Sequence, residues 1–339
     1  MQRTIFALAL LALWPAWGQK KDSPSVASQI NVAYEKYALP NGLEVILHQD
    51  KRLPVVAVNV WYHVGAFHEA RGRSGFAHLF EHMMFQGSQH VGDDQHISLL
   101  ERIGANDLNG STNFYRTNYY QTVPANHLET ALWLESDRMG FLPPAITLES
   151  LNTQREVVKN ERRQRVETSP YGMAEEKAWK AMFPEPHPYH GFGIGSMKDL
   201  DAASLDDVKE FFRTWYAPSN ATLCIAGDFD PAQAKKLVEK YFATFPTGPK
   251  PKPPDVAPVK VSRELVIRHD EEVAALPGVF LSWHTPALFA DGDAAADVLA
   301  SILTHGKSSR LHRRLVRDKQ LADSVSAAQL SLSSQSVFQ

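Results

Sequence analysis

The chain has 339 residues, of which 44% are apolar and 22% carry a charge, and its formal net charge at pH 7 is -3. This composition is typical of a globular protein with room for one large domain or two medium ones, and it excludes a disordered or fibrous chain. Because the net charge is small and the basic residues are spread out, we expect no nucleic-acid partner.

The N-terminus has the layout of a secretory signal peptide, which we place at residues 1–18. A basic residue precedes an apolar run over residues 5–14, and small residues favour cleavage after Gly18. A membrane anchor is the alternative, but the run is about half as long as the ~20 residues of a spanning helix, and Pro15 breaks it. We therefore expect an exported protein, periplasmic or secreted, with no stable membrane span.

Helical and strand-like segments are mixed without strict alternation between residues 34 and 245, which predicts an α+β domain. The only cysteine, Cys224, allows no internal disulfide and no cysteine-built zinc site. Alternating and apolar runs predict strands over residues 43–48, 55–64, 108–123 with a turn, and 221–226. Helical periodicity predicts helices over residues 76–86, 126–139, 148–167, 171–183, 205–216 and 231–245.

The sequence after this domain begins with a proline-rich stretch. Six prolines among residues 246–258 exclude a helix or a central strand, and we interpret residues 246–262 as a semi-rigid linker. Beyond it, the pattern predicts a strand over 279–283, helices over 291–303 and 308–317, and a strand-like end. Because the chain stops in an alternating pattern without a closing element, we expect residues 263–339 to form an incomplete second domain.

The segment GFAHLFEHMMFQG, residues 75–87, places two histidines on one face of a predicted helix. An apolar stripe that starts at Phe76 covers one face, and His78, Glu81 and His82 lie on the other with Phe85. Residues four apart lie one turn above each other, so both imidazoles can bind one metal ion, and Glu81 can take a proton from a water that the metal activates. A solvated helix face is the alternative; we predict a metal site.

A catalytic zinc usually takes a third protein ligand, which must here be His, Asp or Glu. The predicted helix over residues 148–167 offers several glutamates. Glu161 follows a valine pair by one turn and shares a half-buried face, whereas Glu156 lies on a polar face, so periodicity favours Glu161. We interpret the neighbouring Arg162, Arg163 and Arg165 as a solvated charge run rather than a clamp for substrate.

The order His78-x-x-Glu81-His82 is an inverted zinc-peptidase motif. Other characteristic stretches are YALPNGLEV at residues 37–45, LNGSTN at 108–113, QREVVKNE at 154–161, WYAPSN at 215–220, AGD at 226–228 and KSSRL at 307–311. With these motifs, the sequence from about residue 34 to its end resembles the pitrilysin/insulinase family of zinc metallopeptidases, most closely its bacterial processing-peptidase-like members.

The resemblance implies a zinc metalloendopeptidase in which His78, His82 and Glu161 bind one Zn2+ per chain and Glu81 is the general base. It also implies an α+β fold, with a mixed or antiparallel sheet covered by helices, that occurs twice and carries the metal only in its first copy. Many members have an acidic residue seven positions before the third ligand. This chain has Gln154 there, so support of the zinc ligands from that position is in doubt.

The resemblance further implies a peptide substrate that adds a strand to a sheet edge. The matching segment consists of Asn109, Gly110, Ser111 and Thr112, where main-chain pairing would make recognition weakly dependent on substrate sequence. A plain edge strand and turn is the alternative interpretation of this segment.

Two rival functions stay open. A catalytically silent or truncated family member could act as a partner or binding subunit. The resemblance also allows this chain itself to form a homodimer, or a heterodimer with a family member that lacks the metal motif. S-ribosylhomocysteine lyases also carry His-x-x-Glu-His on a helix, but those enzymes are short and cytosolic, whereas this chain is long and has an export signal.

Overall fold

The computed structural model describes residues 32–270 and 272–339, and the expected signal peptide lies outside the described residues. We call residues 32–245 the metal-site unit and residues 246–339 the C-terminal part; the domain boundary itself stays a prediction. Among the described residues, no helix combines the length and the apolar character that crossing a membrane requires.

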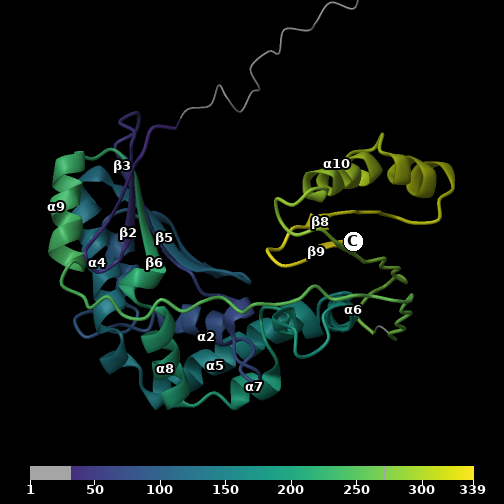
Figure 1. Ribbon diagram of the computed structural model, residues 1–339, viewed down its shortest axis with the longest axis horizontal. Coiled ribbons are helices and arrows are strands. Elements are labelled where there is room, and N and C mark those ends of the chain that lie inside the picture. Colours follow the sequence, from purple (N-terminus) through teal and green to yellow (C-terminus); the bar gives the residue numbers. More distant parts are fainter. Residues whose placement is uncertain (1–31, 271) are drawn as a thin grey trace, which may run out of the picture.

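A six-stranded mixed sheet forms the centre of the metal-site unit (Figure 1), in the order β1-β2-β6-β3-β5-β4. The strands are β1 (Glu35–Ala38), β2 (Glu44–Gln49), β3 (Val55–Tyr62), β4 (Asn106–Thr112), β5 (Thr117–Pro124) and β6 (Ala221–Gly227). β2 and β6 run parallel, and every other pair in this sheet is antiparallel. This arrangement confirms the predicted α+β class and leaves β4 at one edge of the sheet.

Alternation of side chains explains why these strands form. In β3, Val56, Val58, Val60 and Tyr62 are buried in the core, and the intervening residues point to the other face. The hairpin of β4 and β5 accounts for the strand and turn predicted over residues 108–123. β1 was not predicted, because its four residues EKYA are mostly exposed and carry no alternating pattern.

Helices α4 and α9 lie beside the sheet, and α2, α5 and α8 lie below it in the view of Figure 1. The helices are α2 (Phe76–Met83), α3 (Gln95–Arg102), α4 (Leu128–Phe141), α5 (Leu148–Arg162), α6 (Gly172–Met182), α7 (Met197–Asp201), α8 (Leu205–Trp215) and α9 (Pro231–Phe242). Short helical turns that the site uses are η1 (Ala66–His68) and η5 (Pro188–Gly191). Thr147, Ser204 and Asp230 each accept a hydrogen bond from the backbone N–H three residues on, and so fix the starts of α5, α8 and α9.

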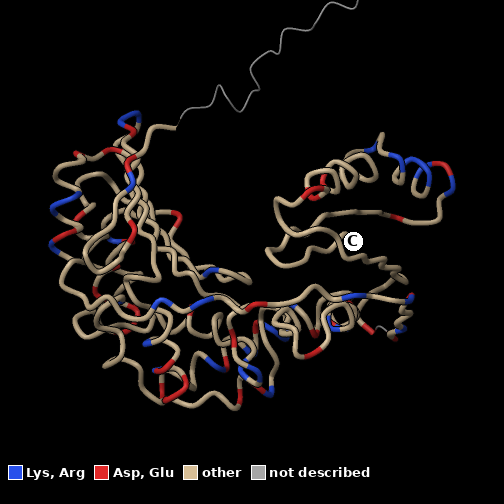
Figure 2. Tube along the Cα trace, in the orientation of Figure 1, with Lys and Arg blue, Asp and Glu red and all other residues tan. Residues whose placement is uncertain are grey.

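The C-terminal part crosses the molecule as an extended segment and then forms a small antiparallel sheet with one α-helix (Figure 1). Its elements are β7 (Trp283–Thr285), α10 (Asp293–Thr304), the π-helix η7 (His312–Asp318), β8 (Gln329–Leu330) and β9 (Ser336–Phe338). The strand predicted over residues 279–283 is wrong except at Trp283, because no neighbouring strand pairs with residues 279–282. Figure 2 shows Lys and Arg gathered around η7, so the basic residues are less evenly spread than their sequence positions indicated.

Contacts between the metal-site unit and the C-terminal part centre on an aromatic cluster. Phe67, Phe183 and Tyr189 of the metal-site unit pack with Leu332 and Val337 near the end of the chain. We call the segment from β8 to β9, residues 329–338, the C-terminal hairpin. Hydrogen bonds from this hairpin reach Tyr115 and Tyr189 of the metal-site unit.

Candidate metal centre

Helix α2 presents two faces of opposite character, as its sequence predicts. Phe76, Leu79, Phe80 and Met83 are buried against the core, whereas the histidines face away from it. The rings of His78 and His82 have centroids 4.9 Å apart, consistent with positions one helical turn from each other. The helix therefore supplies two imidazoles on one side.

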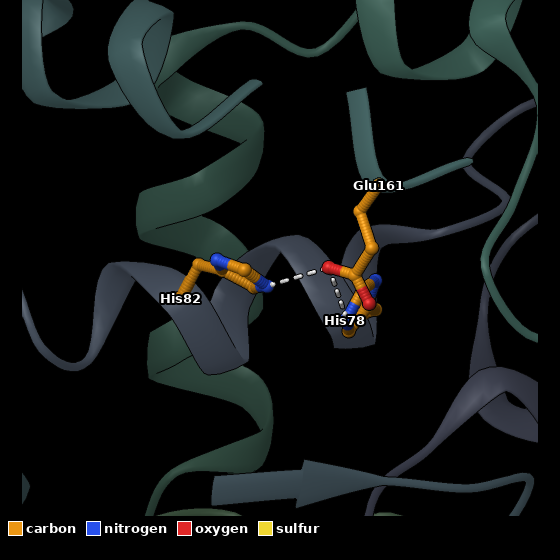
Figure 3. A group of neighbouring side chains, drawn as sticks. All are labelled: His78, His82 and Glu161. Carbon is orange, nitrogen blue, oxygen red and sulfur yellow. Dashed lines mark ion pairs between the residues drawn. The ribbon is translucent and has the colours of Figure 1, made fainter. Parts of the chain in front are cut away.

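Glu161 approaches these imidazoles from α5, which packs against α2. Its Oε2 lies 3.6 Å from Nε2 of His78 and 3.4 Å from Nε2 of His82 (Figure 3). Glu156, the alternative ligand, instead pairs with Lys159 at the surface, at 2.9 Å. The structure thus brings His78, His82 and Glu161 together and leaves Glu156 outside the site.

The three side chains fit the donor set of a zinc ion. One ligand atom from each lies within 4.8 Å of the others, and among the described residues no other group of three His, Cys, Asp or Glu side chains converges in this way. Two imidazole nitrogens and a carboxylate oxygen are common zinc ligands, and a three-ligand site keeps a position open for water or substrate. These three residues could therefore hold a zinc ion and leave one coordination position free.

Electrostatics keep these ligands in the forms that bind metal. Burial lowers the pKa of His78 to about 4, although the charge of Glu161 acts in the opposite direction, so its imidazole is neutral near pH 7. The hydrogen bond with His82 lowers the pKa of Glu161 most, and Arg165 holds its other oxygen, with Nη1 2.7 Å from Oε1. Both residues therefore have free electron pairs at neutral pH.

The support behind His78 is less complete. Its Nδ1 is buried, and no hydrogen-bond partner for it lies in the described part of the chain. Gln154, the position where an acidic residue was expected, lines the same cavity as the ligands. In metal sites such an N–H usually donates to a carboxylate or a backbone carbonyl, which fixes the orientation of the ring.

Glu81 lies on α2 with its carboxylate against β4. Thr112 Oγ1 donates a hydrogen bond of 2.5 Å to Oε2 of Glu81. Burial raises the pKa of Glu81, and this hydrogen bond acts against that rise. At Gly110, a Cβ atom would lie 3.0 Å from Cγ of Glu81 and 3.2 Å from the ring of Phe85, so helix and strand meet at a residue without a side chain.

A cavity of about 1320 Å³ joins the metal ligands to the edge strand. All four residues of the expected substrate segment, Asn109 to Thr112, line it together with His78, Glu81, His82 and Glu161. Phe114, Trp179 and Phe192 form part of its wall, and Ser282, Val337 and Gln339 of the C-terminal part also line it. Sequence patterns carried no signal for these wall residues, because they come from separate turns and helices.

The interpretation of the arginines beside Glu161 as a solvated run is wrong for Arg162. Its side chain is buried and donates to Oε2 of Glu176 on α6, at 2.7 Å. The signal was present in the sequence, since Arg162 follows the buried Val158 by one helical turn. After Arg162 the helix widens into a π-helix over Arg163–Glu167, a form that is often found near functional sites.

Family profiles match most of the chain. The profile described as Insulinase (Peptidase family M16) matches residues 44–187, and the profile described as Peptidase M16 inactive domain matches residues 202–339. The chain is 31% identical over 309 residues to zinc protease PqqE of Helicobacter pylori. This match spans 90% of the present chain and 68% of the Helicobacter pylori protein. The chain is also 30% identical to the probable zinc protease PqqL of Haemophilus influenzae over 60% of this chain, but over only 22% of that protein.

Solved structures show the same fold. A crystal structure of a protease from Helicobacter pylori superposes with a TM-score of 0.76 and 29% identity, covering 91% of this chain and 74% of that one. The periplasmic protease PqqL from Escherichia coli superposes with a TM-score of 0.70 at 18% identity, covering 91% of this chain and 35% of that one, a likeness of fold alone. With two family profiles and a curated relative in agreement, this chain belongs to the pitrilysin/insulinase family of peptidases.

Proposed function

We propose that the chain is a zinc-dependent metalloendopeptidase that hydrolyses peptides or unfolded segments. The observation that carries this proposal is the convergence of His78, His82 and Glu161, with Glu81 beside them, in one cavity with an open strand edge.

We also propose that the chain is exported, which agrees with the periplasmic location of the Escherichia coli protease PqqL. Cell fractionation, and N-terminal sequencing for cleavage after Gly18, test this export.

Within this proposal, His78, His82 and Glu161 hold the zinc ion. When bound, zinc would supply a Lewis acid that polarises the scissile carbonyl group and makes water more acidic. Glu81 accepts a proton from the attacking water and returns it to the leaving amine. Its raised pKa suits both steps, because a carboxylate with a pKa nearer to neutral takes and releases a proton more evenly. Thr112 orients the carboxylate by holding Oε2.

The hydrogen-bond pattern of the β4–β5 hairpin indicates where a substrate peptide could pair with β4. Asn113 N–H donates to Arg116 O at 2.9 Å and closes the hairpin. Counting back through the antiparallel register, the main-chain groups of Thr112 and Gly110 then point to the free edge. The N–H of Gly110 donates instead to Oδ1 of Asn109 at 2.8 Å. A peptide carbonyl can take the place of that side-chain oxygen as the substrate adds a strand.

A zinc assay and a cleavage assay on the 339-residue chain test the proposal. The parent protein should bind about one zinc per chain by mass spectrometry and cleave a quenched unstructured peptide, and a chelator should stop cleavage. Glu81→Gln should keep the zinc but lose cleavage by roughly 100-fold to 10,000-fold, the range of general-base contributions. His82→Ala should lose both properties.

Glu129→Gln serves as the matched control, because Glu129 is exposed and pairs only with Lys240 and Tyr241 on α9. It should behave as the parent in both assays. Cleavage by Glu81→Gln at the parental rate would refute the assigned base. Zinc binding by a parent protein that cleaves no peptide would instead favour the silent binding subunit.

A further inference from the structure

The metal-binding helix begins at a residue that cannot cap it. The N-cap residue of α2 is Gly75, with φ at +89°, and no side chain caps the first turn from this position. A Cβ at Gly75 would lie 2.7 Å from the carbonyl oxygen of Ile194, so the neighbouring loop excludes a larger residue. The first N–H groups of a helix need acceptors, and a helix of eight residues is marginal without support. The cap must therefore come from elsewhere in the chain.

Glu69 supplies it with both carboxylate oxygens. Oε2 accepts a hydrogen bond of 2.9 Å from the N–H of Gly75, and Oε1 accepts one of 2.8 Å from the N–H of Ala77. Burial raises the pKa of Glu69 to about 8, so near pH 7 these two hydrogen bonds, rather than a full negative charge, hold the first turn. Asp199 holds the residue before the helix, since its Oδ2 accepts from both N–H and Oγ of Ser74. Among the described residues, Glu69 alone accepts hydrogen bonds through its side chain from the first turn itself.

The turn that follows β4 holds Glu69 in place. Glu69 directly follows η1, and η1 is tied to the turn of the β4–β5 hairpin. There the N–H of Ala66 donates to Asn113 O at 3.0 Å, and the N–H of Phe67 donates to Phe114 O at 2.8 Å. The carboxylate thus joins the first turn of α2 to the same hairpin that carries Thr112. Glu69 therefore links helix α2 to the edge strand β4.

Loss of this link would affect the two histidines of α2 differently. His78 follows Ala77 directly and lies in the first turn, whereas Glu81 and His82 lie in the second. Fraying of the first turn would therefore displace His78 from Glu161 while the rest of the helix stays packed. We propose that Glu69 is a positioning residue whose carboxylate fixes the first turn of α2 and so places His78 for metal binding. This inference rests on the proposed zinc function and deepens it.

The experiment compares Glu69→Ala and Glu69→Gln with the parent in the full chain. Zinc affinity is measured by competition with a chromophoric chelator, and the visible absorption of bound Co2+ reports the ligand geometry. Glu69→Ala should weaken zinc binding by about 10-fold to 100-fold, as outer groups around metal ligands do, and should change the Co2+ spectrum. Glu69→Gln keeps one carbonyl acceptor and should recover part of the affinity. Glu129→Ala, which removes an exposed carboxylate, should match the parent.

A second control separates positioning from general loss of stability. Val238→Ala removes buried side-chain volume from α9, away from α2, and should lower the melting temperature but keep the zinc affinity. Hydrogen exchange on the metal-free protein adds a readout that needs no zinc: the amide of Ala77 should exchange faster in Glu69→Ala than in Val238→Ala. Parental zinc affinity in both Glu69 variants, or equal weakening in Val238→Ala, would overturn the inference. A parent protein that binds no zinc would defeat the proposed function, and the exchange rates would still decide whether Glu69 fixes the turn.

Discussion

Two interactions shift the pKa of Glu81 in opposite directions. Burial raises the pKa, and the hydrogen bond from Thr112 lowers it, because that bond stabilises the ionised carboxylate. A general base must be ionised to act, so the acidic limb of the pH profile of kcat/KM reports this pKa. The hydroxyl of Thr112, which we assign to the substrate segment, therefore also lowers the pKa of Glu81, the proposed base.

Thr112→Val should shift that limb to higher pH. The substitution removes the hydrogen bond, the ionised form loses stabilisation, and the pKa of Glu81 rises further above its ordinary value. The measurement is kcat/KM for a quenched peptide across the acidic range. Thr222→Val, which alters a threonine on β6 that contacts His63 and Glu44, should leave the limb in place. A limb that stays put or moves to lower pH in Thr112→Val would contradict the assigned tuning.

At single residues, sequence patterns predicted those features of the site that depend on helical periodicity. His78, Glu81 and His82 share one face of α2, and Glu161 lies three residues after the buried Val158. The contact of Thr112 with Glu81 could not be predicted this way, because it joins a strand to a helix whose relative placement only the folded chain defines.

Among the elements, the contact of α2 with β4 leaves little room for a side chain at residue 110. An added methyl group would meet Glu81 Cγ at 3.0 Å and the Phe85 ring at 3.2 Å, closer than ordinary van der Waals contact. One of these side chains must therefore shift by a few tenths of an ångström. Because Glu81 is the proposed base and does not bind the metal, this crowding should act on catalysis more than on zinc.

Gly110→Ala should lower kcat by up to about 100-fold, since small misplacements of a catalytic group have costs of this order. Zinc content should stay at the parental level. Gly92→Ala is the matched control, because the added Cβ there meets only the flexible side chain of Gln95. Steady-state kinetics and metal analysis of both variants provide the check, and an unchanged kcat in Gly110→Ala would show that the base tolerates the crowding.

Predicted elements succeeded where a capping residue or strong alternation marked them. The starts of α5, α8 and α9 coincide with Thr147, Ser204 and Asp230, and β3 alternates along its length. α3 was not predicted, because it is only eight residues long and buries only two side chains, His96 and Leu100. The strand predicted over residues 279–283 had the right composition, but pairing depends on a neighbour that local sequence does not specify.

In the whole molecule, the C-terminal hairpin is held over the cavity by a few hydrogen bonds. Tyr115 Oη accepts from the N–H of Ser333 at 2.7 Å, and Tyr189 Oη accepts from the N–H of Ser334 at 3.2 Å. The two tyrosine hydroxyls also contact each other. Because Val337 of this hairpin lines the cavity, these bonds help to enclose the space beside the metal ligands.

Tyr189→Phe should loosen the hairpin without removing the metal. The loss of one or both hydrogen bonds of this hydroxyl, each worth about 1 kcal/mol, should speed amide exchange in residues 329–338 by roughly fivefold to thirtyfold. Zinc content should be unchanged, since all three ligands lie in the metal-site unit. Tyr241→Phe removes a comparable hydroxyl, bonded to Glu129 on the far side, and should not change exchange in the hairpin. Equal exchange in the two variants would mean that the hydroxyl of Tyr189 does not hold the hairpin.

The place of β6 in the sheet has a consequence for the order in which the protein can assemble during synthesis. All three ligands have left the ribosome once residue 161 has emerged, but β6 ends at Gly227 and lies between β2 and β3. Until it arrives, the nascent chain holds two separate sheet fragments, β1–β2 and β3–β5–β4. Long-range pairing of this kind is slow because a long loop must close first. The proposed metal ligands are thus made early, whereas the sheet against which α2 packs is completed late.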